Sequence, residues 1–353
     1  MITNSAEYGL IPQRDFFDKD IAVEGNTNNY YIIKKGDFVY NPRKSTTAPY
    51  GPFNCYRLND EGIVSPLYTC LTPVHEEYTE YLLWYFKSPA WYSYIYHNGA
   101  QGGARHDRVG MTNELMDGIP VNLPCLKEQE KISAFLSAID KRIDAQRRLV
   151  ESLKSYKRGV IQRIFSNADN TNSWSKIRIK DLFDNIIEKN HPEEVVLTII
   201  QGFGTVPRDS VDRRISYDSS SVSTYKKVNK DDFIMHLRSF EGGLEIANQN
   251  GIVSPAYTIL RSKQVISPSF FYAYFRSYEF INNKLRPAVE GIRDGKSINM
   301  ETFWNLVISL PPIEKQNFYA VLFDKLDKAI GVSEKDLCCL EDVKRYIFQQ
   351  MFI

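Results

Sequence analysis

Basic side chains in loop-like segments, three of which contain glycines, are the residues of this sequence best suited to binding anions and nucleobases. Arginine can form two parallel hydrogen bonds with guanine, and lysine can anchor a phosphate. Four loop-like segments carry such residues, at positions 41–47, 99–108, 237–243 and 290–297. The candidates are Arg43, Lys44, Arg105, His106, Arg108, Arg238, Ser239, Arg293 and Lys296. An exposed charge without a function is the alternative throughout. It is the favoured interpretation for each residue of segments 237–243 and 290–297 taken singly, and for His106.

No catalytic signature accompanies these loops. The sequence has no Gly-x-Ser-x-Gly, no His-Glu-x-x-His and no Asn-Pro-Pro-Tyr. Residues 291–297 imitate a phosphate-binding loop, but three residues separate the glycines where that motif requires four. We therefore expect a binding protein rather than an enzyme, without catalytic residues.

The charge of the chain is nearly balanced, with a formal net charge of +1. A surface that binds phosphates must then be local. Residues 123–166 hold ten Lys/Arg against five Asp/Glu, whereas residues 1–122 hold ten against fourteen. The basic excess lies in a helical segment, where a solvated helix face explains it equally well.

Several classes of protein are disfavoured by composition. The 353 residues suffice for two domains with 43% hydrophobic residues, so disorder is not expected. The N-terminus resembles no signal peptide, and no apolar run approaches the roughly 18 residues of a membrane span. Five cysteines without a Cys-x-x-Cys motif favour a reducing cytoplasm and no metal site.

The chain is an internal repeat. Gly9–Asp15 returns as Gly204–Asp209, with Gln13 and Arg208 at the same repeat position, 195 residues apart. Gly62–Thr69 returns 189 residues later, and the segment that begins at Leu123 returns 187 residues later. Such drift between blocks indicates loop insertions in two copies of one fold. Gln13 would read adenine and Arg208 guanine if both face DNA bases.

Each copy ends in a long helical pattern that follows a proline. Apolar residues there repeat in alternating steps of four and three, as in a coiled coil, and polar residues interrupt both copies at matching positions. A single pattern of this kind is typical of an oligomerisation helix, but two matched ones favour antiparallel pairing within the chain. Residues 128–165 would span roughly 57 Å. The seam includes Ile132, Leu136, Ile139, Ile143, Val150, Leu153, Phe323, Leu326, Ile330, Leu337, Leu340 and Ile347.

These patterns predict an α+β fold of two mixed α/β domains, related by a pseudo-twofold repeat and joined by two long antiparallel helices. The predicted segments are a first domain at 1–122, a helix at 123–168, a second domain at 169–309 and a helix at 310–353. Residues 174–200 have no counterpart in the first copy, so we expect the first domain to lack opening strands.

The chain resembles the specificity subunits of type I restriction-modification systems. The resemblance lies in the proline and Glu-Gln or Glu-Lys-Gln before each helix, in Ile139–Ile143 with its repeat Leu326–Ile330, and in the duplicated Gly-Ile-Val-Ser-Pro-x-Tyr. It implies two target-recognition domains that read a split, asymmetric sequence in double-stranded DNA. The helices would then act as a ruler, which at about 3.4 Å per base pair limits the separation of the half-sites to ~17 base pairs.

The resemblance also implies partners. Two methyltransferase subunits would bind S-adenosylmethionine, which this chain would not, and motor-nuclease subunits would cleave DNA. Two alternatives remain at this point: an orphan or incomplete specificity subunit, and a coiled-coil scaffold that does not bind DNA. Salt dependence of duplex binding separates the scaffold from a DNA reader.

Overall fold

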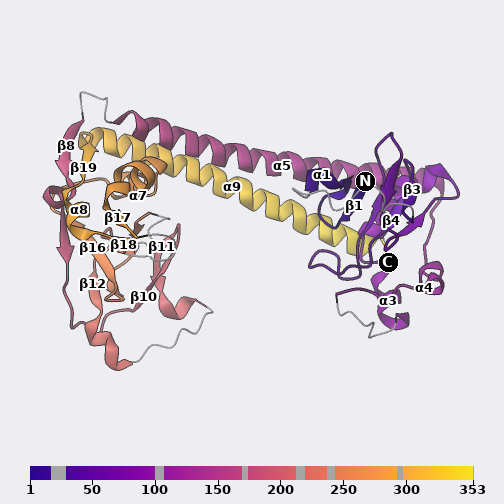
Figure 1. Cartoon of the computed structure of the whole chain (residues 1–353), viewed down its shortest axis with the longest axis horizontal. Coiled ribbons are helices and arrows are strands. Elements are labelled where there is room, and N and C mark those ends of the chain that lie inside the picture. Colours follow the sequence, from indigo (N-terminus) through magenta and orange to yellow (C-terminus); the bar gives the residue numbers. More distant parts are fainter. Residues whose placement is uncertain are drawn as a thin grey trace. The chain divides into compact units, whose positions relative to one another are not determined.

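The computed structural model describes residues 1–16, 29–99, 107–168, 174–211, 219–236, 243–291 and 297–352. Both halves of the chain combine helices with short antiparallel strands (Figure 1), which confirms the α+β fold class. The chain divides into an N-terminal unit, Met1–Arg147 with Lys335–Ile353, and a C-terminal unit, Arg148–Glu334. Each unit therefore includes part of both long helices. The four segments predicted from the sequence instead treat each helix as a segment separate from the two domains.

The N-terminal unit is built from small antiparallel sheets and short helices. Its strands are β1 (Ile2–Ser5) paired with β2 (Gly9–Pro12), β3 (Tyr31–Ile33) paired with β6 (Gly62–Val64), and a sheet in the order β5 (Phe53–Cys55), β4 (Phe38–Tyr40), β7 (Thr69–Leu71). Its short helices are α1 (Gln13–Phe16), α2 (Thr79–Lys87), α3 (Tyr92–Asn98) and α4 (Asn113–Asp117), with a 3-10 turn at Glu76–Tyr78.

The C-terminal unit repeats this order and adds strands. Its pairs are β10 (Leu197–Ile200) with β11 (Gly204–Pro207), β12 (Lys226–Val228) with β15 (Gly251–Val253), β17 (Val289–Glu290) with β18 (Ser297–Ile298), and β19 (Val307–Leu310) with β8 (Ser175–Arg178). A four-stranded sheet has the order β14 (Glu245–Ile246), β13 (Phe233–His236), β16 (Tyr257–Ser262), β9 (Phe183–Ile186). The helices are α6 (Ile179–Leu182), α7 (Pro268–Phe275) and α8 (Met300–Asn305), and single turns of other helix types lie at Arg208–Ser210, Ser219–Thr224, Glu279–Lys284 and Arg286–Ala288.

The strands of the two units pair in the same register. In the first hairpin Ile2 faces Pro12, and in the second Leu197 faces Pro207. The same agreement holds in the larger sheets, where the pair Phe38–Leu71 returns as Phe233–Leu260. A shift of one residue would move every side chain of a strand to the opposite face. The sequence repeat is therefore a repeat of structure down to the residue.

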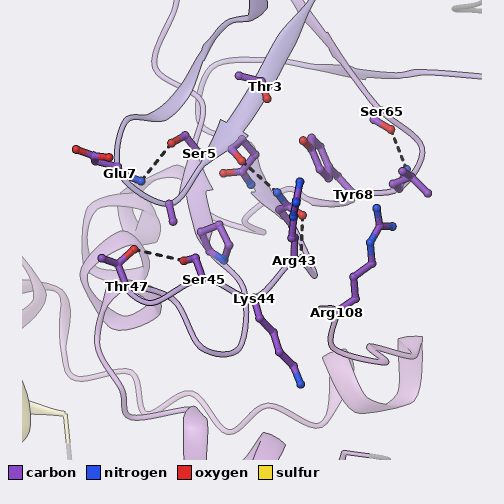
Figure 2. Close-up of a pocket in the computed structure, with 15 residues that line it drawn as sticks. Thr3, Ser5, Glu7, Arg43, Lys44, Ser45, Thr47, Ser65, Tyr68 and Arg108 are labelled. Carbon is purple, nitrogen blue, oxygen red and sulfur yellow. Dashed lines mark hydrogen bonds between the residues drawn. The ribbon is translucent and has the colours of Figure 1, made fainter. Parts of the chain in front are cut away.

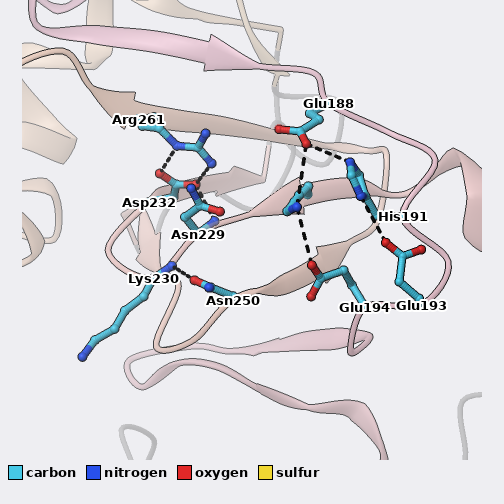
Figure 3. A network of polar contacts seen from close by, with 10 residues as sticks. Glu188, His191, Glu193, Glu194, Asn229, Lys230, Asp232, Asn250 and Arg261 are labelled. Carbon is cyan, nitrogen blue, oxygen red and sulfur yellow. Dashed lines mark hydrogen bonds and ion pairs between the residues drawn. The ribbon is translucent and has the colours of Figure 1, made fainter.

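A turn before β4 and β13 shows why the repeated Gly-Asp-Phe and Asp-Asp-Phe segments recur. The Asp37 carboxylate accepts a hydrogen bond from the Lys34 backbone N–H at 2.7 Å, and Asp232 accepts one from Asn229 at the same distance. The third turn residue has a positive φ in both copies, +97° at Gly36 and +74° at Asp231. These residues shape the fold, and Figure 3 shows Asp232 of the second copy beside Asn229 and Arg261.

Five strands of the C-terminal unit have no equivalent strand among the described residues of the N-terminal unit: β8, β9, β17, β18 and β19. Strand β9 extends the sheet beyond β16, and β8 pairs with β19. The segment 120–123 corresponds to β19 in the repeat, yet it is not a strand in the structure. A strand needs a hydrogen-bonded neighbour, and the described part of the N-terminal unit offers none at this edge. Residues 174–186 thus supply two of the strands by which the two units differ. Residues 197–200, for which the sequence predicted no counterpart, form β10, and the register of its hairpin matches that of β1, so they do have a counterpart in the first copy.

The two long helices are α5 (Leu126–Ser166) and α9 (Ile313–Met351). Within each unit they pair in opposite directions: Asp140 contacts Lys344 and Arg147 contacts Glu341 in the N-terminal unit, so the partner number falls as the residue number rises. All twelve seam residues named from the sequence are buried or half-buried on these helices. The helices predicted from the heptad pattern are therefore present, and their ends agree with the prediction within a few residues.

A glutamine fastens the start of each long helix. Gln129 donates from Nε2 to the Pro124 carbonyl at 2.8 Å, and Gln316 donates to the Pro311 carbonyl at the same distance. Both side chains are buried. The Gln316 Oε1 also accepts from the Ser267 backbone N–H at 3.0 Å, whereas the Gln129 Oε1 has no hydrogen-bond partner among the described residues. The repeated Glu-Gln and Glu-Lys-Gln motifs thus anchor helix starts.

Aromatic side chains form the core of each unit and pack on the long helices. The largest buried cluster of the N-terminal unit joins Trp91 and Phe53 to Leu136 of α5 and to Phe352 after α9. The corresponding cluster of the C-terminal unit joins Phe165 of α5 and Phe323 of α9 to aromatic residues of the sheet and α7. Within the described ranges, no helix is both long and apolar enough to cross a bilayer.

We predict that the two glutamines differ in their contribution to stability. Gln316→Leu leaves a buried N–H of Ser267 and a carbonyl of Pro311 without partners, and should lower the free energy of unfolding by about 1–3 kcal/mol. Urea denaturation of the full chain measures this change.

The matched control is Gln129→Leu, which also removes an acceptor that is already unpaired. It should cost less than about 1 kcal/mol. Equal losses in the two variants would contradict the role assigned to the Ser267 hydrogen bond.

Candidate nucleic-acid interface

A pocket of about 420 Å³ in the N-terminal unit gathers the basic candidates that the structure describes. The loop after β4, the turn of the β1–β2 hairpin and the segment around Arg108 form its walls (Figure 2). Among its lining residues are Arg43, Lys44 and Arg108, the three described members of the first-domain set. We call this pocket the basic cleft.

A backbone bridge brings two of these residues together across 65 positions of sequence. Arg43 and Arg108 pair as antiparallel partners, with hydrogen bonds from the Lys44 N–H to the Asp107 carbonyl and from the Val109 N–H to the Pro42 carbonyl. In Figure 2 the side chains of both arginines lie on the side of the cleft where Tyr68 lies, and Lys44 points away from them. The two loops that carried basic residues in the sequence are therefore two walls of one site.

The cations of the basic cleft outnumber its acids. The Arg43 side chain is 70% exposed, and its nearest carboxylate is that of Asp107, 4.0 Å from Nε. The Arg108 Nε is buried and has no hydrogen-bond partner within the described part of the chain. A buried donor left unpaired costs free energy, so the site is suited to an acceptor from outside. Glu7 is the acidic lining residue.

An asparagine cluster holds the floor of the cleft. The buried Asn4 donates to the Val39 carbonyl at 2.7 Å and accepts from the Asn54 amide at 2.7 Å. Asn41 donates to the Asn4 carbonyl and accepts from the Arg43 backbone N–H at 3.0 Å. These bonds fix the hairpin against the loop that carries Arg43. The sequence analysis missed these asparagines, which belong to no repeated motif.

The other repeat candidates, Gln13 and Arg208, occupy equivalent places in the two units. Each follows the second strand of its hairpin, and the backbone N–H of each donates to a carbonyl before the first strand, Met1 for Gln13 and Val196 for Arg208. The Arg208 guanidinium lies 3.5 Å from the Tyr225 hydroxyl. Burial raises the pKa of nearby Tyr257, and the positive charge of Arg208 opposes that rise. Arg208 thus packs on tyrosines of its own unit.

The remaining candidates lie outside the described residues, so the structure says nothing about their positions. They are Arg105, His106, Arg238, Ser239, Arg293 and Lys296.

A second kind of groove occurs once in each unit, beside the long helices. Asp140, Ile143 and Lys344 line it in the N-terminal unit, and their repeat equivalents Asp327, Ile330 and Lys157 line it in the C-terminal unit. Lys87 and its equivalent Arg276 add a cation to each. Burial lowers the pKa of Lys87. We call these the paired grooves.

An exposed aromatic residue marks the hairpin turn of each unit. Tyr8 is 60% exposed and Phe203 is 62% exposed, and the two share a repeat position. Tyr8 also lines the groove of the N-terminal unit, and Gly202, beside Phe203, lines that of the C-terminal unit. Neither residue was predicted from the sequence, although their equal repeat positions are visible there.

Groups of acidic, histidine or cysteine side chains that could hold a metal ion are not found among the described residues. The basic cleft itself provides hydrogen-bond donors and positive charges. Two guanidinium groups, an ammonium group and the hydroxyls of Ser45 and Thr47 suit phosphate oxygens and the acceptor edges of bases.

Part of the chain is similar in sequence to known proteins. Residues 16–155 match the family model described as the type I restriction modification DNA specificity domain. A type I restriction enzyme MjaX specificity subunit of Methanocaldococcus jannaschii is 23% identical over 291 residues, which cover 76% of this chain. The chain spans 65% of the length of that relative.

Two solved structures share the fold. A chain from the structure that describes complex assembly and conformational transition of the type I R-M system aligns with a TM-score of 0.60 and 17% identity, over 95% of this chain and 86% of that one. The HsdS subunit of Thermoanaerobacter tengcongensis aligns with a TM-score of 0.51 and 17% identity, over 91% and 81%. Residues 16–155 thus match the model of the type I restriction modification DNA specificity domain, and the fold of the chain is similar to the folds of these two solved structures.

Proposed function

We propose that this chain is the specificity subunit of a type I restriction-modification system, binding double-stranded DNA and selecting its sequence. The observation that carries the proposal is the basic cleft, where Arg108 presents an unpaired donor beside Arg43 on a scaffold of the specificity family. Phosphate contacts position a protein on DNA, and contacts with base edges select the sequence. A rigid pair of arginines can serve both purposes.

The repeat supports recognition of a target in two parts. Both units share strand register and turns, so each can present loops to one half-site. The loops differ in sequence: Asn41–Thr47 of the first unit and Leu237–Gly243 of the second share an arginine at one repeat position, Arg43 and Arg238, and little else. Two different readers imply two different half-sites, by the logic with which symmetric dimers read palindromes.

The paired grooves support an assembly with two copies of a partner. Residues at several equivalent positions line the groove of each unit, and surfaces repeated within one chain can each bind the same surface of another protein. Two modification subunits would occupy them and bring S-adenosylmethionine and the methyl-transfer chemistry, while motor-nuclease subunits would cleave DNA. This chain itself would hold no cofactor and perform no catalysis.

We predict that Arg108→Ala weakens duplex binding by about tenfold to a hundredfold, because one contact with a base or phosphate is lost. If the contact is with phosphate, the slope of log affinity against log salt concentration should also fall by about 0.9. Fluorescence anisotropy with duplex DNA at several salt concentrations measures both.

The matched control is Arg57→Ala, since Arg57 already pairs with Glu80 and lies outside the basic cleft. It should leave binding unchanged. If Arg108→Ala binds like the native chain while Arg57→Ala does not, the interface lies elsewhere.

A second prediction concerns the target itself. Together with a cognate modification subunit, the chain should direct methylation to a sequence of two unlike halves that flank unspecified base pairs. Sequencing of methylated DNA identifies the modified sites. A continuous motif, or methylation that ignores sequence, would sink the model of two readers.

A further inference from the structure

Four ion pairs join α5 to α9, and the repeat sorts them into two classes. In the N-terminal unit Asp140 pairs with Lys344, and Arg147 pairs with Glu341 at 2.9 Å. In the C-terminal unit Lys157 pairs with Asp327, and Lys154 pairs with Glu334 at 2.9 Å. The four cations and four acids occupy positions that the 187-residue repeat maps onto each other.

The first class is the same in both halves of the repeat. Asp140 maps onto Asp327, and Lys157 maps onto Lys344. Each long helix thus carries one aspartate and one lysine at these positions. If α5 met a second α5 in the same antiparallel geometry, Asp140 would face Lys157 of the other copy. This class of pair would therefore form in either arrangement.

The second class is reversed between the helices. Arg147 maps onto Glu334, and Lys154 maps onto Glu341. Helix α5 is therefore positive at both of its positions, and α9 is negative at both. Two copies of α5 in the same geometry would bring Arg147 against Lys154, and two copies of α9 would bring Glu334 against Glu341. Like charges at such flanking positions oppose pairing.

We propose that Arg147, Lys154, Glu334 and Glu341 form a selectivity layer that directs α5 to pair with α9 of its own chain and not with the like helix of a second copy. The apolar seam cannot make this choice, because it is duplicated: Ile143 maps onto Ile330 and Leu153 onto Leu340. Without the selectivity layer, the repeat would leave like helices almost as well matched as unlike ones.

Exposure suits these residues to selecting a partner. The Arg147 and Glu341 side chains are 55% and 44% exposed. Pairs so exposed contribute little to stability, since water and salt screen them. Opposed like charges in the wrong pairing add a penalty that the right pairing avoids, so selectivity can exceed the stabilisation of any one pair. The inference does not depend on what the chain binds.

The test compares two variants of the full chain that have the same composition and net charge. In Arg147→Glu/Glu334→Lys, both α5–α9 pairs become like-charged, while both pairings of like helices become complementary. In Arg147→Glu/Glu341→Lys, both α5–α9 pairs stay complementary. Light scattering measures association over a range of protein concentrations, and urea denaturation measures stability, each at low and at high salt.

Relative to the second variant, we expect the first to shift the balance roughly tenfold from α5–α9 pairing within the chain toward pairing of like helices from two copies. The reason is that two ion pairs change from attraction to repulsion. Either a larger dimer fraction or a lower unfolding midpoint supports the proposal, provided that the difference disappears at about 1 M salt, where charges farther apart than about 3 Å are screened. Variants that match in association and midpoint at low salt, or that differ equally at high salt, overturn it.

Discussion

The packing of each mixed domain against the two long helices is the interaction on which the rest of the structure depends. The N-terminal core is completed by Leu136 from α5 and by Phe352 at the far end of the chain. The C-terminal core takes Phe165 from α5 and Phe323 from α9. Removal of large buried aromatic residues from water is the dominant stabilising term in such domains. Each unit is thus a sheet and helix assembly that only the two long helices close.

This dependence explains why the helix starts are fixed so firmly. A helix that completes a core must enter it at one register, and the buried glutamines set that register by folding back on prolines that precede the helix. The loops outside the cores and the long helices are not held to one register in this way. Asp37 and Asp232 tie down the turns that border the sheets, and residues on the loops between them can differ between the two units without loss of the fold.

The sequence predicted those parts of the fold that depend on local or periodic patterns. The heptad steps located α5 and α9 because burial of one helix face repeats every three to four residues. The repeat predicted equal turns because the same turn residues recur. The bridge of Arg43 with Arg108 could not be predicted, since it joins segments 65 residues apart that share no pattern. The position of the Arg208 side chain could not be predicted either, because it lies against Tyr225 rather than pointing freely into solvent.

The positions of the positive charges in the structure also distinguish cations that pair the long helices from cations that are candidates for binding nucleic acid. The ten cations of residues 123–166 suggest a nucleic-acid surface on composition alone. Three of them, Arg147, Lys154 and Lys157, instead pair with acids of α9, so part of the excess belongs to helix pairing. The basic cleft has fewer cations, yet the Arg108 Nε within it is buried and has no hydrogen-bond partner among the described residues. An unpaired buried donor, rather than total charge, is therefore the feature on which we base the proposed anion-binding site of this nearly neutral chain.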